Sequence, residues 1–180
     1  NWQYWDGSGN VPAISLPGSG DTTIFNGTVS ALYSSGDQTI MNMQLGRDGG
    51  GDVSLRITGG KLTVTEDFII GAKPWWASEA GNGTLYVDGG QLDVQRHMRV
   101  GDHGAGHLVI TAGTINIAGA LSVPSVENTS SPDRSGRIDL VGGVINADTL
   151  ALKGWDETPV MGRIDIQGGT LHIVQNEDWR

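Results

Sequence analysis

Residues 53–64 read VSLRITGGKLTV, and this stretch decides the fold because the chain repeats its pattern. In it, two short runs of alternating apolar and polar residues flank a pair of glycines. Four further copies are TLYVDGGQLDV (84–94), HLVITAGTINI (107–117), RIDLVGGVINA (137–147) and RIDIQGGTLHI (163–173). A unit that recurs about every 23 to 30 residues is typical of a solenoid, in which each unit forms one coil of a stack.

Each unit predicts three short strands. Apolar residues occupy every second position before the glycine pair, as Leu55 and Ile57 do, and again after it. This alternation is typical of half-buried strands. A third alternating run follows a short turn, with the apolar pairs Phe68/Ile70, Met98/Val100, Leu121/Val123 and Leu150/Leu152, and Met43/Leu45 as an earlier counterpart.

The glycine pair lies at the bend between the first two strands, where a tight turn requires a positive φ or a close backbone approach. Stacking equivalent strands in parallel gives three sheets around one apolar interior, with neighbouring coils about 4.8 Å apart. Crossover connections between parallel strands are right-handed in the great majority of cases. The sequence therefore predicts an all-β fold, a right-handed parallel β-helix of five to six coils.

We expect a single domain that spans 1–180. Residues 1–21 lack the repeated pattern and begin with the aromatic-rich NWQYW. Because an open solenoid end must be covered, this segment is predicted to be an N-terminal cap, with the coils at 22–180. Only VQNEDWR (174–180) follows the last copy, so the C-terminal end is expected to be incompletely capped or to continue into further sequence.

The composition excludes several classes of partner. The formal net charge is −9, which disfavours the phosphates of a nucleic acid and an anionic membrane surface. There is no cysteine, so disulfides and thiolate catalysis are ruled out. No apolar run approaches the length of a transmembrane helix, and we expect a soluble chain.

The connection from the third strand of one coil to the first strand of the next is the part of the unit that varies. Its five loops cover 47–52, 72–83, 102–106, 124–136 and 153–162. If the coils superpose, all five loops leave one corner and form a single wall. The short loop 102–106 lies between two long ones and predicts a notch in that wall.

Two adjacent tryptophans, Trp75 and Trp76, occur in a loop rich in Gly, Ser and Ala. Flat apolar rings with an N–H group suit a ligand with an apolar face and a polar rim, and a sugar ring is such a ligand. The alternative is that the rings fold back over their own loop. The predicted ligand-binding residues in the wall are Trp75, Trp76, His103, Asp133, Arg134 and Trp155.

Carboxylates are plentiful in the wall, but none of them stands out as a catalytic pair. Glycoside cleavage needs two carboxylates roughly 5 to 9 Å apart. Glu79 and Asp133 face each other across the predicted notch, and they would be the pair if the protein were an enzyme. We predict no catalytic residue and keep the enzyme as an alternative.

No metal site or cofactor is predicted. Asp102, His103 and His107 lie close in sequence, but their spacing matches no closed metal site. RDGGGD at 47–52 is acidic and rich in glycine, yet it lacks the repeated nonapeptide that binds calcium in β-rolls. Calcium between coils is left open.

The outward faces of the strands are a second place for function. The outward residues of the first strand are Arg56, Tyr86, Val109, Asp139 and Asp165, and those of the second are Thr63, Asp93, Asn116, Asn146 and His172. Columns of such mixed types are typical of solvated strands. We expect no cluster of Asp with a Lys or Arg base on them, which disfavours a polysaccharide lyase.

The opening LPGSGDTTIFNG (16–27), the GG-[KQT]-L-x-[VI] turns and the ends Ile70-Gly71 and Val100-Gly101 resemble the β-solenoid repeat regions of bacterial secreted proteins. These regions are of the autotransporter-passenger and PEP-CTERM-associated types. The resemblance implies a secreted or cell-surface location, attachment to a larger multidomain protein and a connection with glycans.

Together these observations predict a non-catalytic module that binds a polysaccharide through the loop wall. Two alternatives stay open. One is a glycoside hydrolase or lyase on the same scaffold, and the other is a structural stalk or adhesin segment.

Overall fold

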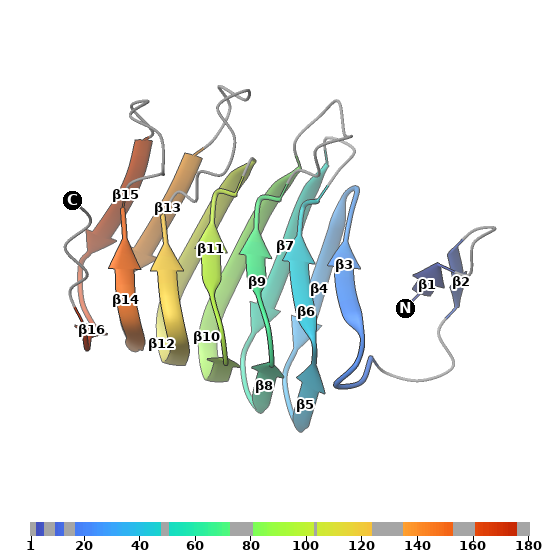
Figure 1. Ribbon diagram of the computed structural model, residues 1–180, viewed down its shortest axis with the longest axis horizontal. Coiled ribbons are helices and arrows are strands. Elements are labelled where there is room, and N and C mark those ends of the chain that lie inside the picture. The colour runs from blue at the N-terminus through green and yellow to red at the C-terminus, as the bar shows by residue number, and fades with distance from the viewer. Residues whose placement is uncertain are drawn as a thin grey trace.

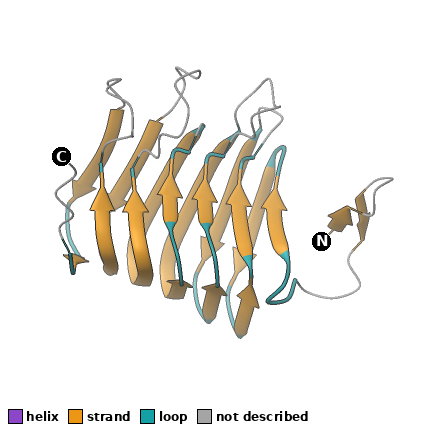
Figure 2. Cartoon of the chain, viewed as in Figure 1, coloured by secondary structure: helices purple, strands orange, loops and turns teal. Residues whose placement is uncertain are grey.

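The computed structural model describes residues 3–5, 10–12, 17–47, 51–72, 81–102, 104–123, 135–152 and 161–175. These residues form strands, turns and bends (Figures 1 and 2). No helix occurs among them, and so none of them could cross a membrane as a helix.

Three stacks of parallel strands correspond to the three strands of the repeated unit. Sheet 1 contains β4 (Val29–Tyr33), β7 (Asp52–Ile57), the first parts of β10 (Asn82–Val94) and β12 (Ala105–Ser122), β13 (Ser135–Leu140) and β15 (Met161–Ile166). Sheet 2 contains β5 (Asp37–Ile40), β8 (Lys61–Val64), the next parts of β10 and β12, the first part of β14 (Val144–Ala151) and β16 (Thr170–Ile173). Sheet 3 contains β3 (Thr22–Phe25), β6 (Asn42–Leu45), β9 (Phe68–Ile70), β11 (Met98–Val100) and the ends of β12 and β14.

The strands pair in the register that the repeats predict. Leu85 pairs with Leu55 on one side and with Leu108 on the other, and the same column continues through Ile138 to Ile164. In Figure 1 the strands of sheet 3 stand side by side and point the same way. The predicted class of fold, an all-β parallel β-solenoid, is confirmed.

The inward residues of the three sheets form one core cluster that runs along the stack. Leu85, Leu108 and Ile138 of sheet 1 are completely buried, as are Phe68 and Met98 of sheet 3. Burying a side chain of this size contributes roughly 1.5–3 kcal/mol. The columns of Leu, Ile and Val that define the repeat therefore also hold the turns together.

The glycine pair is required by both conformation and space. Gly90 has a φ of 70°, and a Cβ on it would lie 2.7 Å from the backbone of the turn below, at Gly59 and Gly60. A Cβ on its neighbour Gly89 would lie 2.6 Å from the carbonyl oxygen of Thr58. Because successive turns meet backbone to backbone at this bend, a side chain at either position would push them apart.

The first turn, β4 to β6, follows the repeated pattern only in β6, where Met43 and Leu45 lie. Tyr33 pairs with Ile57 and Gln38 with Leu62, so two residues with polar groups occupy apolar columns. The Tyr33 hydroxyl donates a hydrogen bond to the carbonyl of Gly36 at 2.8 Å. The Gln38 amide donates one to the carbonyl of Pro17.

The N-terminal residues include one further pair of strands. β1 (Gln3–Trp5) pairs antiparallel with β2 (Asn10–Pro12), and the two form a separate sheet. The predicted cap at 1–21 otherwise lies mostly outside the described residues, and its role stays a prediction.

Candidate functional site

The variable loops begin and end at one corner of the solenoid. The strands that precede them stop in register, as Leu45 and Ile70 do, and the strands that follow start in register, as Ala105 and Ser135 do. The common corner is confirmed for these described loop ends. The residues predicted to bind or act there lie outside the described residues, and their roles stay predictions: Trp75, Trp76, Glu79, His103, Asp133, Arg134 and Trp155.

The described residues contain a different candidate surface, an open groove of about 400 Å³ on the outside of sheet 2. The groove runs along the stack, because three successive turns each contribute the same three positions to it. We call it the sheet-2 groove, and its lining is Asp93, Val94, Gln95, Asn116, Ile117, Ala118, Asn146, Ala147, Asp148 and Val174.

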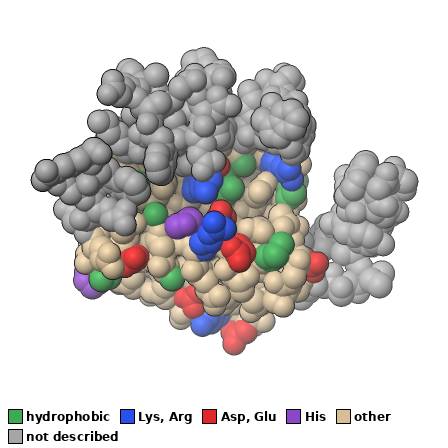
Figure 3. All heavy atoms as spheres, viewed as in Figure 1, with side chains coloured by type: hydrophobic (Ala, Val, Ile, Leu, Met, Phe, Trp, Pro, Cys, Tyr) green, Lys and Arg blue, Asp and Glu red, His purple; other side chains and the backbone are tan. Residues whose placement is uncertain are grey.

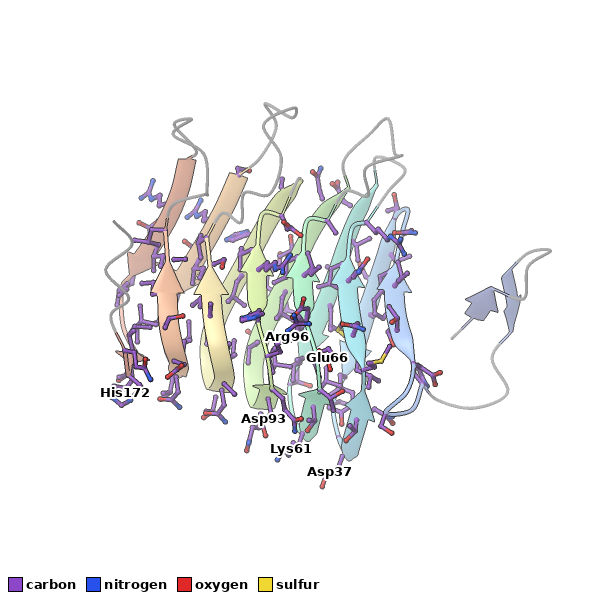
Figure 4. All side chains as sticks on the ribbon, in the orientation of Figure 1. Asp37, Lys61, Glu66, Asp93, Arg96 and His172 are labelled. Carbon is purple, nitrogen blue, oxygen red and sulfur yellow. The ribbon has the colours of Figure 1, made fainter. Side chains whose placement is uncertain are left out.

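A row of hydrogen-bonded side chains crosses the turns within this groove. The Asn146 amide donates to Asn116 Oδ1 at 2.8 Å, and the Asn116 amide donates to Asp93 Oδ1 at 2.7 Å. The Lys61 ammonium lies 2.8 Å from Asp93 Oδ2, and Figure 4 shows these two side chains next to each other on neighbouring turns. The row fixes the orientation of both amides, whose remaining N–H and lone-pair capacity can serve a ligand.

Asp93 provides a permanent negative charge at one end of the row. Partial burial alone would raise the pKa of its carboxyl group, but hydrogen bonds from Lys61, Asn116 and Gln91 outweigh that effect and lower it. The Gln91 amide lies 2.8 Å from Asp93 Oδ1. The carboxylate is therefore ionised at neutral pH and acts as a hydrogen-bond acceptor only.

Apolar atoms complete the lining of the groove. Ala118 is exposed and carries only a methyl group, and Val174 is 66% exposed. Binding sites for small molecules and chain segments commonly combine apolar surface with a few well-placed polar groups. The sheet-2 groove has this character, with amides and carboxylates arranged in a line.

A second group of polar side chains lies on the outer face of sheet 1, and it was not expected. Asp139 accepts hydrogen bonds from His107 and Arg137, each at 2.8 Å. Asp165 lies 2.7 Å from Arg163 and 3.6 Å from Arg137. The expectation that no Asp with an Arg would cluster on a sheet face is wrong, and we call these five residues the sheet-1 cluster.

The register of two consecutive repeats produces the sheet-1 cluster. Arg-Ile-Asp occurs at 137–139 and again at 163–165, and both ends of the tripeptide point outward. Adjacent turns therefore place two Arg residues in one column and two Asp residues in the next. The repeated tripeptide was the signal in the sequence that could have revealed the cluster.

The charge state of Asp139 constrains the chemistry of the sheet-1 cluster. Its side chain is 13% exposed, and burial alone would raise the pKa of the carboxyl group, but hydrogen bonds from His107 and Arg137 lower it overall. A general acid for glycoside cleavage needs a raised pKa. Asp139 is thus suited to an ion pair rather than to proton donation.

The residues considered as metal ligands do not come together in the described part of the chain. His107 Nε2 contacts Asp139, and the Asp102 carboxylate faces Arg99 at 3.7 Å. His103 lies outside the described residues. Among the residues that the structure describes, no three His, Cys, Asp or Glu side chains form a metal-binding group.

The face of the molecule drawn in Figure 3 mixes charges of both signs in its described part. Arg96 lies 3.1 Å from Glu66, and Arg99 lies 3.6 Å from Asp67. Because these basic side chains face acidic ones, they form balanced pairs rather than the uncompensated basic surface that a polyanion requires.

Comparisons of the chain with protein-family models, with curated proteins and with solved structures gave no match. The molecule is thus placed by its own geometry in the class of parallel β-solenoids, with two polar outer surfaces and one corner of variable loops.

Proposed function

We propose that the protein is a non-catalytic module that binds a polysaccharide on the outside of its solenoid. The observation that carries this proposal is the sheet-2 groove. There Asp93, Asn116 and Asn146 present carboxylate and amide groups in a hydrogen-bonded row beside apolar methyl groups.

The repeat distance of the row favours a polymer over a small ligand. Equivalent positions on neighbouring turns lie about 4.8 Å apart, which is comparable to the advance of one sugar residue along an extended glycan chain. Each turn would then offer one polar group to one sugar, and the exposed side chains of Ala118 and Val174 would face the C–H side of the rings. A neutral glycan matches the paired charges of the surface better than a polyanion does.

The groove and the predicted tryptophan loops belong to different corners of the solenoid. The groove lies where sheet 2 ends, whereas the loops run between sheet 3 and sheet 1. Binding at the two places is therefore separable by mutation. The loops would provide stacking surfaces, and the groove would provide hydrogen bonds.

The experiment measures the retardation of the protein in native gels that contain one polysaccharide of a panel, followed by calorimetry with the best ligand. The variant Asn116→Ala/Asn146→Ala is expected to weaken binding about tenfold, since each lost hydrogen bond contributes about 0.5–1.5 kcal/mol. Asn82→Ala is the matched control, because Asn82 donates a similar bond between turns, to Asp52 at 3.0 Å, far from the groove. Equal binding by both variants would refute the groove as the site.

One observation favours the enzyme as a second candidate function. The sheet-1 cluster combines two carboxylates, two guanidinium groups and an imidazole on an exposed sheet face. A lyase would use such a face to neutralise and deprotonate a uronate. Assay of the same polysaccharides for new reducing or unsaturated ends, with Asp139→Asn as the comparison, separates this candidate from the binding module. A stalk or adhesin segment would show neither retention nor product.

A further inference from the structure

The last turn that the structure describes exposes an inward position that is buried in the four turns before it. Ile57, Val87, Ile110 and Leu140 share one inward column of sheet 1 and are each 0% exposed, whereas Ile166 in the same column is 57% exposed. Within the described residues, β15 pairs only with β13 and β16 only with β14. This end of the stack therefore combines an open strand edge with an apolar surface.

The opposite end of the stack is built differently. There Tyr33 and Gln38 replace aliphatic residues in the inward columns. The Tyr33 hydroxyl is satisfied by the carbonyls of Gly36 and Lys61, at 2.8 and 2.9 Å, and Gln38 by the carbonyl of Pro17. One end thus carries polar groups that its own chain satisfies, and the other has an interior-type surface without such groups.

We propose that the edge strand β15 binds a second copy of this chain across a twofold axis, as an antiparallel pair centred on Ile164. In that register Arg163 lies opposite Asp165 of the second copy, and Asp165 lies opposite its Arg163. Ile166 lies opposite Gly162 of the second copy, where the absence of a side chain leaves room for it. The sequence Gly-Arg-Ile-Asp-Ile (162–166) is therefore complementary to itself when reversed, in charge and in size.

Head-to-tail stacking fits less well. Continuing the parallel register would place Leu32 of one copy beside Asp165 of the next, and Gln38 beside Leu171. Both contacts match an apolar group with a polar or charged one. The twofold contact is also closed, so it gives a dimer instead of a fibre.

Sedimentation velocity of the 180-residue chain, from low micromolar to near-millimolar concentration, tests the proposal. A concentration-dependent dimer is expected. Asp165→Arg places like charges opposite each other across the axis, which is strongly unfavourable at an interface, and should weaken dimerisation at least about tenfold. Adding Arg163→Asp to that variant restores opposite charges and should restore the dimer.

Two further variants keep the test decisive if the charge variants do not fold. Ile166→Asp changes an exposed side chain and should abolish the dimer with little effect on the thermal unfolding of dilute protein. Leu32→Asp is the matched control at the other end, since Leu32 is 66% exposed on the edge strand β4, and it should leave the dimer intact. A monomer at every concentration, fibres, loss of the dimer in the Leu32 variant, or a dimer unaffected by Ile166→Asp would each overturn the proposal.

Discussion

Substituting alanine for glycine in the stacked bend should separate the cost of backbone conformation from the cost of contact between turns. Gly36, Gly90 and Gly169 occupy equivalent bends and have φ values of 85°, 70° and 75°. A residue with a Cβ costs roughly 1–2 kcal/mol in this left-handed region. A Cβ on Gly36 meets nothing within 4 Å, and among the described residues no turn stacks on this side of it. Gly36→Ala should therefore lose only about 1–2 kcal/mol.

Gly90→Ala should lose more. Its Cβ would lie 2.7 Å from backbone atoms of Gly59 and Gly60, and backbone held in a parallel sheet cannot move aside as a flexible side chain can. Overpacking of this kind typically adds 1–3 kcal/mol, for a total of roughly 2–5 kcal/mol. For a chain of this size, 1 kcal/mol corresponds to about 2–4 °C in Tm. The Gly90 variant should thus melt several degrees below the Gly36 variant.

Thermal unfolding followed by the far-ultraviolet circular dichroism of the β-strands would measure these differences in dilute protein. Fraying of the terminal turn could also make Gly36→Ala mild, and Gly169→Ala controls for this. Gly169 lies in the last turn, yet its Cβ would approach the carbonyl oxygen of Gly143 to 2.6 Å. If contact between turns matters, Gly169→Ala resembles Gly90→Ala. Equal Tm values for the Gly36 and Gly90 variants would refute the reasoning.

Three further predictions concern the core, the effect of pH and the loops. Leu140→Asp should unfold the middle of the stack, because Leu140 is 0% exposed and an unpaired buried charge costs several kcal/mol. A two-state urea transition with an unchanged midpoint would contradict this prediction. Hydrogen bonding lowers the pKa of Asp93 and of Asp139, so both carboxylates stabilise the fold above the unfolded pKa of about 4 and lose this effect as the pH falls further. Asp139→Asn should therefore reduce the loss of Tm between pH 5 and pH 3 or so. A pH profile of Tm identical to that of the native chain would argue against this prediction. Trp75→Ala or Trp76→Ala should weaken polysaccharide binding by about 1 kcal/mol without changing Tm, because each substitution removes a stacking surface. Full affinity in both variants would exclude the tryptophan loop as a binding surface.

The sequence was sufficient for the class of fold because the inward columns and the bends repeat nearly without change. Leu55, Leu85 and Leu108 align by inspection, and the structure pairs them in that register. The first turn was harder to see. Its bend reads Ser34-Ser35-Gly36 instead of a glycine pair, and Tyr33 and Gln38 interrupt the apolar columns. Among the described strands, β4 and β5 pair on one side only.

The candidate surfaces were predicted only in part. The column Asp93, Asn116 and Asn146 was expected on the outside of sheet 2, but its hydrogen bonds depend on side-chain orientations that periodicity does not fix. The sheet-1 cluster does not follow from any single column of outward residues. Arg137 contacts Asp139 two residues away and also Asp165 on the next turn, so the cluster extends over two columns.

A parallel solenoid assigns stability and recognition to different columns of the same strand. Between the end turns, inward positions must stay apolar and the second residue of each bend must stay glycine, because every turn packs on the next at those points. Outward positions are free of this requirement, so any polar residue that recurs in register becomes a linear array with the spacing of the turns, about 4.8 Å. Such an array matches a chain of repeating units better than a compact molecule, since a polymer can contact several turns in succession. The row from Asn146 to Asp93 has this form, and for that reason an extended glycan is the ligand that we would test first.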